Sequence, residues 1–87
     1  MTADPYDSLK ARLDDVHDWP CVYTFKFIMK KERLAAFVTL FEGHRYTTRD
    51  SAAGRHVAVT AEIFVETSDE VIAMYRAAAR HEGVIAL

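Results

Sequence analysis

One lysine, Lys26, interrupts the apolar run WPCVYTFKFIM, and three of the basic residues that follow it are candidates to lie beside it. These groups are Arg45, Arg49 and His56. Ammonium, guanidinium and imidazolium groups all donate hydrogen bonds to carboxylates and phosphates. If the fold brings them to one surface, these four side chains become candidate ligand contacts for an anion. The alternative for Lys26 is a structural role, because a lysine keeps a sheet surface wet and discourages aggregation.

Metal ligands and nucleophiles form no recognisable pattern in this chain. The four histidines are far apart, with no i, i+4 pair, and there is no Cys-x-x-Cys motif. The single cysteine, Cys21, has no base beside it in the sequence, which favours a small residue near the core over a nucleophile. The basic segment MKKER contains no glycine, so it lacks the phosphate-cradling loop of an acylphosphatase-like enzyme. We therefore expect a protein that is not an enzyme, with no catalytic residues, metal or cofactor.

Length and composition limit the class of protein. The chain has 87 residues, which suits one small domain, and 51% hydrophobic with 28% charged residues is typical of a globular protein. A net charge of −2 does not indicate nucleic-acid binding. No apolar run approaches the roughly 18 residues of a membrane span, and the N-terminus lacks the apolar core of a signal peptide. A single cysteine cannot form an internal disulfide, which fits a reducing cytoplasm. Together these features lead us to expect a cytoplasmic protein that binds neither nucleic acid nor membrane.

Two segments alternate with the period of a β-strand. Residues 22–29 are mainly β-branched or aromatic, and residues 55–65 have the clearest alternation in the chain. The side chains expected to face the core are Tyr23, Phe25, Phe27, Met29, Val57, Val59, Ala61, Ile63 and Val65. Those expected to face outward are Val22, Thr24, Lys26, Ile28, His56, Ala58, Thr60, Glu62 and Phe64.

The remaining segments complete an alternating order of elements. Residues 31–41 carry a helical apolar stripe, residues 44–49 read as a polar edge strand, and TSDE at 67–70 matches a helix capping box. That second helix is expected to reach about residue 81. A short strand at 84–87 follows, and a short helix at 6–16 with a stripe of Leu9, Leu13 and Val16 precedes the whole.

The order strand, helix, strand, strand, helix, strand predicts an α+β fold of the ferredoxin-like βαββαβ type. Right-handed crossovers then give a four-stranded antiparallel sheet with two helices on one face. We expect an N-terminal helical extension at 1–18 and the ferredoxin-like domain at 19–87. The first strand should be central, between the third and fourth, with the other sheet face left open.

Four outward apolar residues define a second candidate site, an interaction surface on the open face. They are Val22, Ile28, Ala58 and Phe64. Exposed apolar patches mark partner or self-association surfaces. An RNA-recognition module of the same topology would need stacking aromatics on this face, whereas the aromatics of residues 22–29 share the core parity.

Three stretches resemble the YbeD family of small bacterial proteins of unassigned function. They are WPCVYTFKFI at 19–28, DSAAG followed by RHVAVTAEIFV at 50–65, and TSDEVIAMYRAAARHEGVIAL at 67–87. The resemblance implies a fold similar to the regulatory ACT domains that sense small ligands, and some members carry the label of a lipoate regulatory protein. ACT domains that bind amino acids usually have a glycine near the loop after the first strand. The corresponding segment here, MKKE, contains none.

Two functional hypotheses follow. The first is a non-enzymatic regulatory or sensing domain that binds a small anionic metabolite or a partner protein. The alternative is a pure protein-interaction module or homodimeric adaptor that uses the open sheet face. Ligand-dependent stabilisation separates the first hypothesis from the second.

Overall fold

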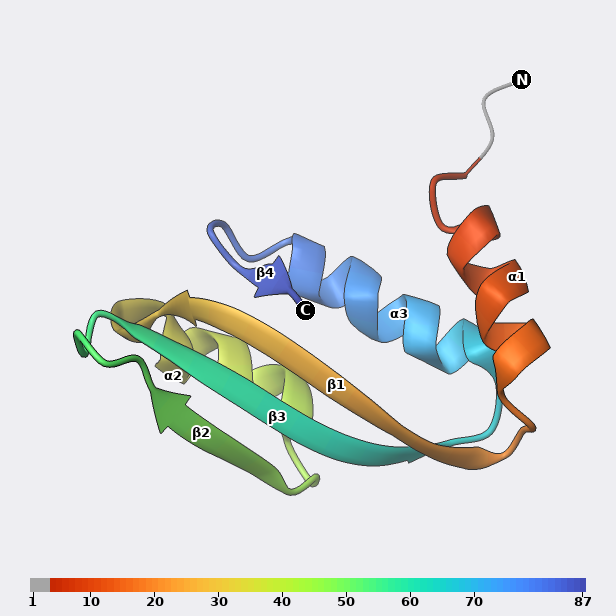
Figure 1. Ribbon diagram of the computed structural model, residues 1–87, viewed down its shortest axis with the longest axis horizontal. Coiled ribbons are helices and arrows are strands. Elements are labelled where there is room, and N and C mark those ends of the chain that lie inside the picture. The colour runs from red at the N-terminus through yellow and green to blue at the C-terminus, as the bar shows by residue number, and fades with distance from the viewer. Residues whose placement is uncertain (1–3) are drawn as a thin grey trace.

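The computed structural model describes residues 4–87, so the first three residues of the expected extension lie outside it. The helices are α1 (Asp7–Val16), α2 (Leu34–Phe37) and α3 (Ser68–Ala79), and two 3-10 turns, η1 (Lys31–Arg33) and η2 (Val38–Phe41), flank α2. The strands are β1 (Cys21–Lys30), β2 (Tyr46–Asp50), β3 (His56–Val65) and β4 (Ile85–Ala86). They form one antiparallel sheet in the order β2-β3-β1-β4, an α+β architecture with β1 and β3 in the centre (Figure 1).

The central pair of strands sorts the side chains into two faces. β1 and β3 pair over their whole length, from Cys21 opposite Val65 to Lys30 opposite His56. Phe25, Phe27 and Met29 are buried on one face together with the alternate residues of β3. The predicted parity of both strands is therefore confirmed, because large apolar side chains at every second position can share only one side of a pleated sheet.

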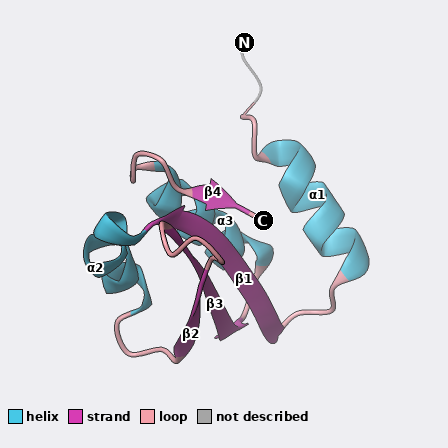
Figure 2. Cartoon of the chain, turned by 60° about the vertical axis from the view of Figure 1, so that its left-hand side comes forward, coloured by secondary structure: helices cyan, strands magenta, loops and turns pink. Residues whose placement is uncertain are grey.

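The helices pack on the face where these aromatic residues lie. A single core cluster joins β1 and β3 to Phe37 and Phe41 from the α2 region and to Val71, Ile72 and Ala78 from α3. α2 and α1 lie toward opposite ends of the sheet, with α3 between them (Figure 2). All the helical material therefore covers one side of the sheet.

The segment 31–41 has the predicted limits but is not one continuous α-helix. It consists of η1, one turn of α-helix in α2, and η2. No side chain caps its start at Lys30, where two lysines also oppose the helix dipole. Near its end, the Thr39 hydroxyl donates to the Ala36 carbonyl at 2.7 Å, which competes with regular helical bonding. Only Phe37 and Phe41 of this segment are fully buried, so packing rather than propensity holds it.

The start of α3 also differs from the expected capping box. Thr67 is the N-cap residue as predicted, but its side chain makes no capping bond. The Glu70 carboxylate accepts a hydrogen bond from the Glu66 backbone N–H instead of reaching the N–H of Thr67. Thr67 itself has an extended backbone conformation. The helix ends at Ala79, two residues before the predicted limit.

Helix α1 docks on α3 through a narrower stripe than expected. Leu13 is 4% exposed and belongs to the core cluster, and Leu9 packs partly against it. Val16, the third member of the predicted stripe, is 71% exposed. Val16 is the last residue of α1, and it does not belong to the apolar residues that pack against the core cluster.

Polar contacts fix α1 against the N-terminal turn of α3. The Lys10 ammonium donates to the Ser68 hydroxyl at 2.7 Å and lies 3.1 Å from Asp69. The Ser68 hydroxyl is the main cause of the lowered pKa of Asp14, and Asp69 is the main cause of the raised pKa of Lys10. Farther along α3, the Arg76 guanidinium pairs with Asp4 and lies over the ring of Tyr6, 4.7 Å from its centroid. These contacts tie the extension to the sheet domain at two points.

The burial of Leu13 predicts the stability contributed by α1. Replacing Leu13 with Ala should lower the free energy of unfolding by about 2–3 kcal/mol, because it leaves a cavity in the core. The matched control, Val16→Ala, should change it by less than about 0.5 kcal/mol, since the valine is largely exposed. Urea denaturation of the purified variants measures both values. Equal losses from the two changes would contradict this docking mode.

Candidate functional site

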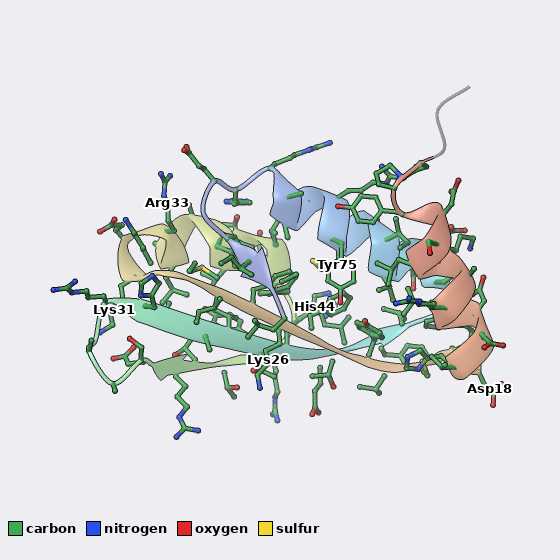
Figure 3. The ribbon with its side chains drawn as sticks, turned by 45° about the horizontal axis from the view of Figure 1, so that its top comes forward. Asp18, Lys26, Lys31, Arg33, His44 and Tyr75 are labelled. Carbon is green, nitrogen blue, oxygen red and sulfur yellow. The ribbon has the colours of Figure 1, made fainter. Side chains whose placement is uncertain are left out.

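The candidate site is the sheet face opposite the helices. Figure 3 shows Lys26 projecting from β1 on the side away from α3. Cross-strand pairing places Lys26 opposite Thr60 of β3, and Thr60 in turn opposite Thr47 of β2. Within residues 4–87, no helix lies over this face. The outward side chains of β1, β2 and β3 therefore form one continuous, solvent-facing surface, which we call the open face.

Two of the sequence-predicted cations lie in adjoining rows of the open face. The row next to Lys26 consists of Ile28, Ala58 and Arg49, which are directly opposite one another on β1, β3 and β2. Neighbouring strands are about 4.8 Å apart and residues rise about 3.4 Å along each strand, so two strand spacings and a two-residue step put the backbones of Lys26 and Arg49 about 12 Å apart. Both side chains are long enough to lean over the small residues between them. An anion could therefore contact both.

Arg45 lies beside the same face, at the start of β2. It lines a shallow hollow of about 270 Å³ together with Tyr46, Thr47, Thr60 and Glu62. This hollow contains a carboxylate as well as a guanidinium, so it presents both charges. Arg45 therefore lies near Thr60, the residue opposite Lys26. Glu62 lines the same hollow as Arg45.

His56 lies at the far corner of the sheet, away from Lys26. It is opposite Lys30, and a hollow of about 410 Å³ at this corner also includes Gly54 and Arg55. Lys30 and Arg55 were not among the predicted contacts, although Lys30 has the same strand parity as Lys26. Two other cations nearby have partners: Lys31 is 2.8 Å from Asp50, and Arg33 is 4.0 Å from Glu82.

The electrostatic state of the open face follows from its lack of ion pairs. Within the described part of the chain, no carboxylate lies within ion-pair distance of Lys26, Arg45 or Arg49. Glu62 is a carboxylate of the same face and lines the hollow with Arg45, but it forms no ion pair with any of the three. Such cations can bind an added anion without first breaking a protein salt bridge.

The predicted apolar surface divides into two parts. Val22 and Phe64 are directly opposite each other and are 58% and 62% exposed. Ile28 and Ala58 are also opposite each other, but both are half-buried. The rows that contain Thr24 and Lys26 separate the two pairs. The pair of Val22 and Phe64, which we call the apolar pair, is thus the more exposed part.

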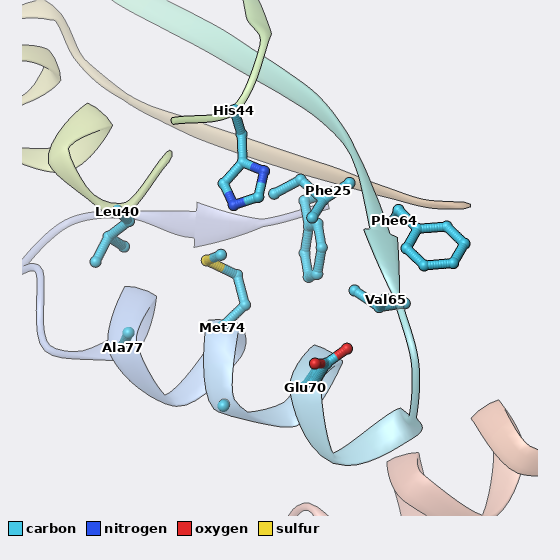
Figure 4. Close-up of a pocket in the computed structure, with 10 residues that line it drawn as sticks. Phe25, Leu40, His44, Phe64, Val65, Glu70, Met74 and Ala77 are labelled. Carbon is cyan, nitrogen blue, oxygen red and sulfur yellow. The ribbon is translucent and has the colours of Figure 1, made fainter. Parts of the chain in front are cut away.

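A second hollow lies on the helix side and was not predicted. It encloses about 390 Å³ between α3, the end of η2 and β3. Its lining is mainly apolar, with His44 and Glu70 as polar members, and Figure 4 shows Met74 extending into it from α3. The Glu70 carboxylate already accepts the Glu66 N–H, so it is partly committed to the start of α3. These residues come from distant parts of the sequence, and no local pattern links them.

Two tyrosines form the main polar contact inside the helix-covered side. The hydroxyls of Tyr23 and Tyr75 are 2.9 Å apart. Burial is the main cause of the raised pKa of Tyr75, and the hydrogen bond to Tyr23 adds to it. Their rings pack edge-on against each other and against Phe25. The hydrogen bond between the two hydroxyls therefore joins β1 to α3.

Groups suited to metal binding or membrane insertion do not occur in the part of the chain that the structure describes. No cluster of three or more histidine, cysteine, aspartate or glutamate side chains there could hold a metal ion. None of the helices described has the length and apolar character needed to cross a membrane. Cys21 is a half-buried free thiol.

The fold and the open face together define a small α+β domain with one helix-covered and one exposed sheet surface. Residues 14–87 match the family DUF493, described as a protein of unknown function, and the chain belongs to this family. This finding agrees with the resemblance to the YbeD-like family. Most of α1 precedes the matched region. No curated protein and no solved structure shows a significant match.

The tyrosine pair predicts how stability depends on alkaline pH. Because the folded-state pKa of Tyr75 is raised, its contribution is fully present below the unfolded pKa of about 10 and is lost as the pH rises above it. Tyr75→Phe should therefore flatten the decline of unfolding free energy above about pH 10. At neutral pH it should cost about 0.5–1.5 kcal/mol, because the Tyr23 hydroxyl loses its partner.

Urea denaturation across the alkaline range measures this effect. Tyr46→Phe, at the exposed edge of the sheet, is the matched control and should keep the wild-type decline. An unchanged alkaline decline in Tyr75→Phe would show that other groups control it.

Proposed function

We propose that this protein is a non-enzymatic regulatory or sensing domain with a ferredoxin-like, ACT-like fold, which binds a small anionic ligand on its open face. The observation that carries the proposal is the group of unpaired cations there, with Lys26 and Arg49 in adjoining rows. Arginine binds carboxylate and phosphate groups with two parallel hydrogen bonds, and lysine adds a compact charge. The hydroxyls of Thr47 and Thr60 lie between the cations as further donors.

The exposure of the site sets the kind of binding. Contacts between exposed charges are screened by salt, and each adds little free energy. Binding should therefore be modest in affinity and weaken at high ionic strength, as suits a reversible sensor. We place this activity in the cytoplasm, in keeping with the single cysteine.

The same face argues against RNA as the ligand. Recognition modules of this topology stack bases on aromatic residues of the two central strands. Here Phe25 and Phe27 of β1 are buried under the helices. Phe64 is the aromatic residue that the central strands of the described chain expose on the open face. A small anion needs no such platform.

A thermal-shift screen tests the proposal, with amino acids, lipoate, nucleotides and short-chain acids as probes. A ligand at about 100 times its dissociation constant adds about 2.7 kcal/mol, which is a shift of several degrees in a domain of this size. Lys26→Gln and Arg49→Gln should each reduce the shift. Arg12→Gln, an exposed arginine on α1, is the matched control and should keep it. A flat screen, or a shift that survives both open-face changes, would contradict the proposal.

The alternative function is a pure protein-interaction module or homodimeric adaptor. The observation that favours it is the apolar pair, two large side chains that are opposite each other and mostly exposed. Large exposed aromatic side chains are enriched among the residues that dominate binding energy at interfaces.

Phe64→Asp tests this alternative. The change should leave folding intact, since the ring is largely exposed, and should abolish partner capture or self-association. Val16→Asp makes the same type of change at an exposed apolar position on α1 and should have no effect on association. Light scattering and pull-down assays provide the readout. If Phe64→Asp leaves both oligomeric state and partner capture unchanged, the apolar pair is not an interface.

A further inference from the structure

Strand β2 has one unpaired edge. It is the outermost strand next to β3, and all five of its residues are exposed. Figure 1 shows no element of the described chain beyond it. Unpaired strand edges are templates for pairing with another chain, and proteins commonly protect them with proline, charged side chains (especially lysine) or a bulge. The sequence Tyr-Thr-Thr-Arg-Asp has neither proline nor lysine, its acidic residue is paired with Lys31, and it pairs with β3 without a bulge.

The backbone groups that face outward can be assigned from the pairing with β3. The Ser51 N–H donates to the His56 carbonyl at 2.9 Å, which extends the register of β2 by one residue. In an antiparallel ladder, alternate residues direct both backbone groups to the same neighbour. Ser51, Arg49 and Thr47 therefore face β3. The free edge is faced by the backbone N–H and C=O groups of Tyr46, Thr48 and Asp50.

We propose that a second copy of this chain pairs antiparallel with β2, about a two-fold axis at Thr48. In an antiparallel pair, residues directly opposite each other have their side chains on the same face of the sheet. Two identical strands related by a two-fold axis meet this condition only if the axis passes through a residue rather than between two residues. With the axis at Thr48, Tyr46 is opposite Asp50 of the second copy. Every outward N–H and C=O of the strand then has a partner.

Charge excludes the neighbouring registers. An axis at Thr47 would place Arg45 opposite Arg49 of the second copy, and an axis at Arg49 would place the two Arg49 side chains opposite each other. Like charges directly opposite are destabilising. With the axis at Thr48, Arg49 is opposite Thr47 instead. The charge of Asp50 is already balanced by Lys31, 2.8 Å away, and Arg49 is exposed on the open face, so the pairing buries no unpaired charge.

This pairing joins the two open faces into one surface. Arg49 of each copy becomes the cross-strand neighbour of Thr47 of the other copy, and Thr47 belongs to the row of Lys26. The inference rests on the edge geometry alone and does not depend on anion binding. It also differs from a dimer through the apolar pair, which would stack the sheets face to face.

Cysteine cross-linking tests the register. In a Cys21→Ala background, Thr48→Cys should form a disulfide-linked dimer under mild oxidation. The two Cα atoms of such a pair are about 5.5 Å apart, within disulfide range. Thr47→Cys, the adjacent exposed threonine, is the matched control and should not cross-link, because its counterpart is displaced along the strand. Cross-linking through Thr47 rather than Thr48, or through neither, would overturn the proposal.

Proline substitution tests the edge itself. Thr48→Pro removes an N–H that faces the free edge, while the ladder to β3 does not use that group. It should raise the dissociation constant of the dimer about tenfold or more, since one donor is lost in each copy. Thr48→Val keeps the N–H and should keep the dimer.

Analytical ultracentrifugation over a range of concentrations provides the readout. A wild-type protein that is monomeric throughout overturns the proposal, as does a dimer that Thr48→Pro leaves unchanged. If Thr48→Pro fails to fold, the two cysteine variants decide the question on their own.

Discussion

The pairing of β1 with β3 is the constraint on which the rest of the structure depends. Ten residue pairs run from Cys21 opposite Val65 to Lys30 opposite His56 without a bulge. Because side chains alternate along a strand, this single register decides which groups are buried and which face solvent. A slip of one residue would expose Phe25 and Phe27 and bury Lys26. The hydrophobic core and the candidate site are therefore set by the same hydrogen-bond ladder.

The uneven covering of the sheet connects this ladder to function. α2, α3 and α1 all pack on the side of the buried aromatic residues, and α1 is held there by Leu13 and by the contacts of Lys10. The opposite side has no cover within residues 4–87, and it carries Lys26 and Arg49 without ion-pair partners. A domain of this size that leaves a sheet face exposed can use it for binding without rearranging its core.

The sequence predicted the parts of the fold where a strong pattern and the packing agree. The two central strands were found because large apolar residues alternate over their whole length. The segment 31–41 was less predictable, since its regularity is lost where Lys31 opposes the helix dipole and Thr39 bonds to Ala36. Val16 fitted the helical stripe in the sequence, but the structure shows that its side chain is largely exposed.

The sequence was enough to predict which sheet face each candidate residue occupies, but not which of these residues lie close together. Even-numbered positions of β1 indicated that Lys26 faces outward, whereas the register was needed to place Arg49 in the next row and His56 at a distant corner. An NMR titration of the amide signals with inorganic phosphate tests the central claim, that the open face binds anions. Anion binding on this face should shift the amide signals of Lys26, Thr60 and Arg49 and leave those of α1 unchanged. Shifts confined to the hollow around Met74 and His44, or none at all, would contradict it.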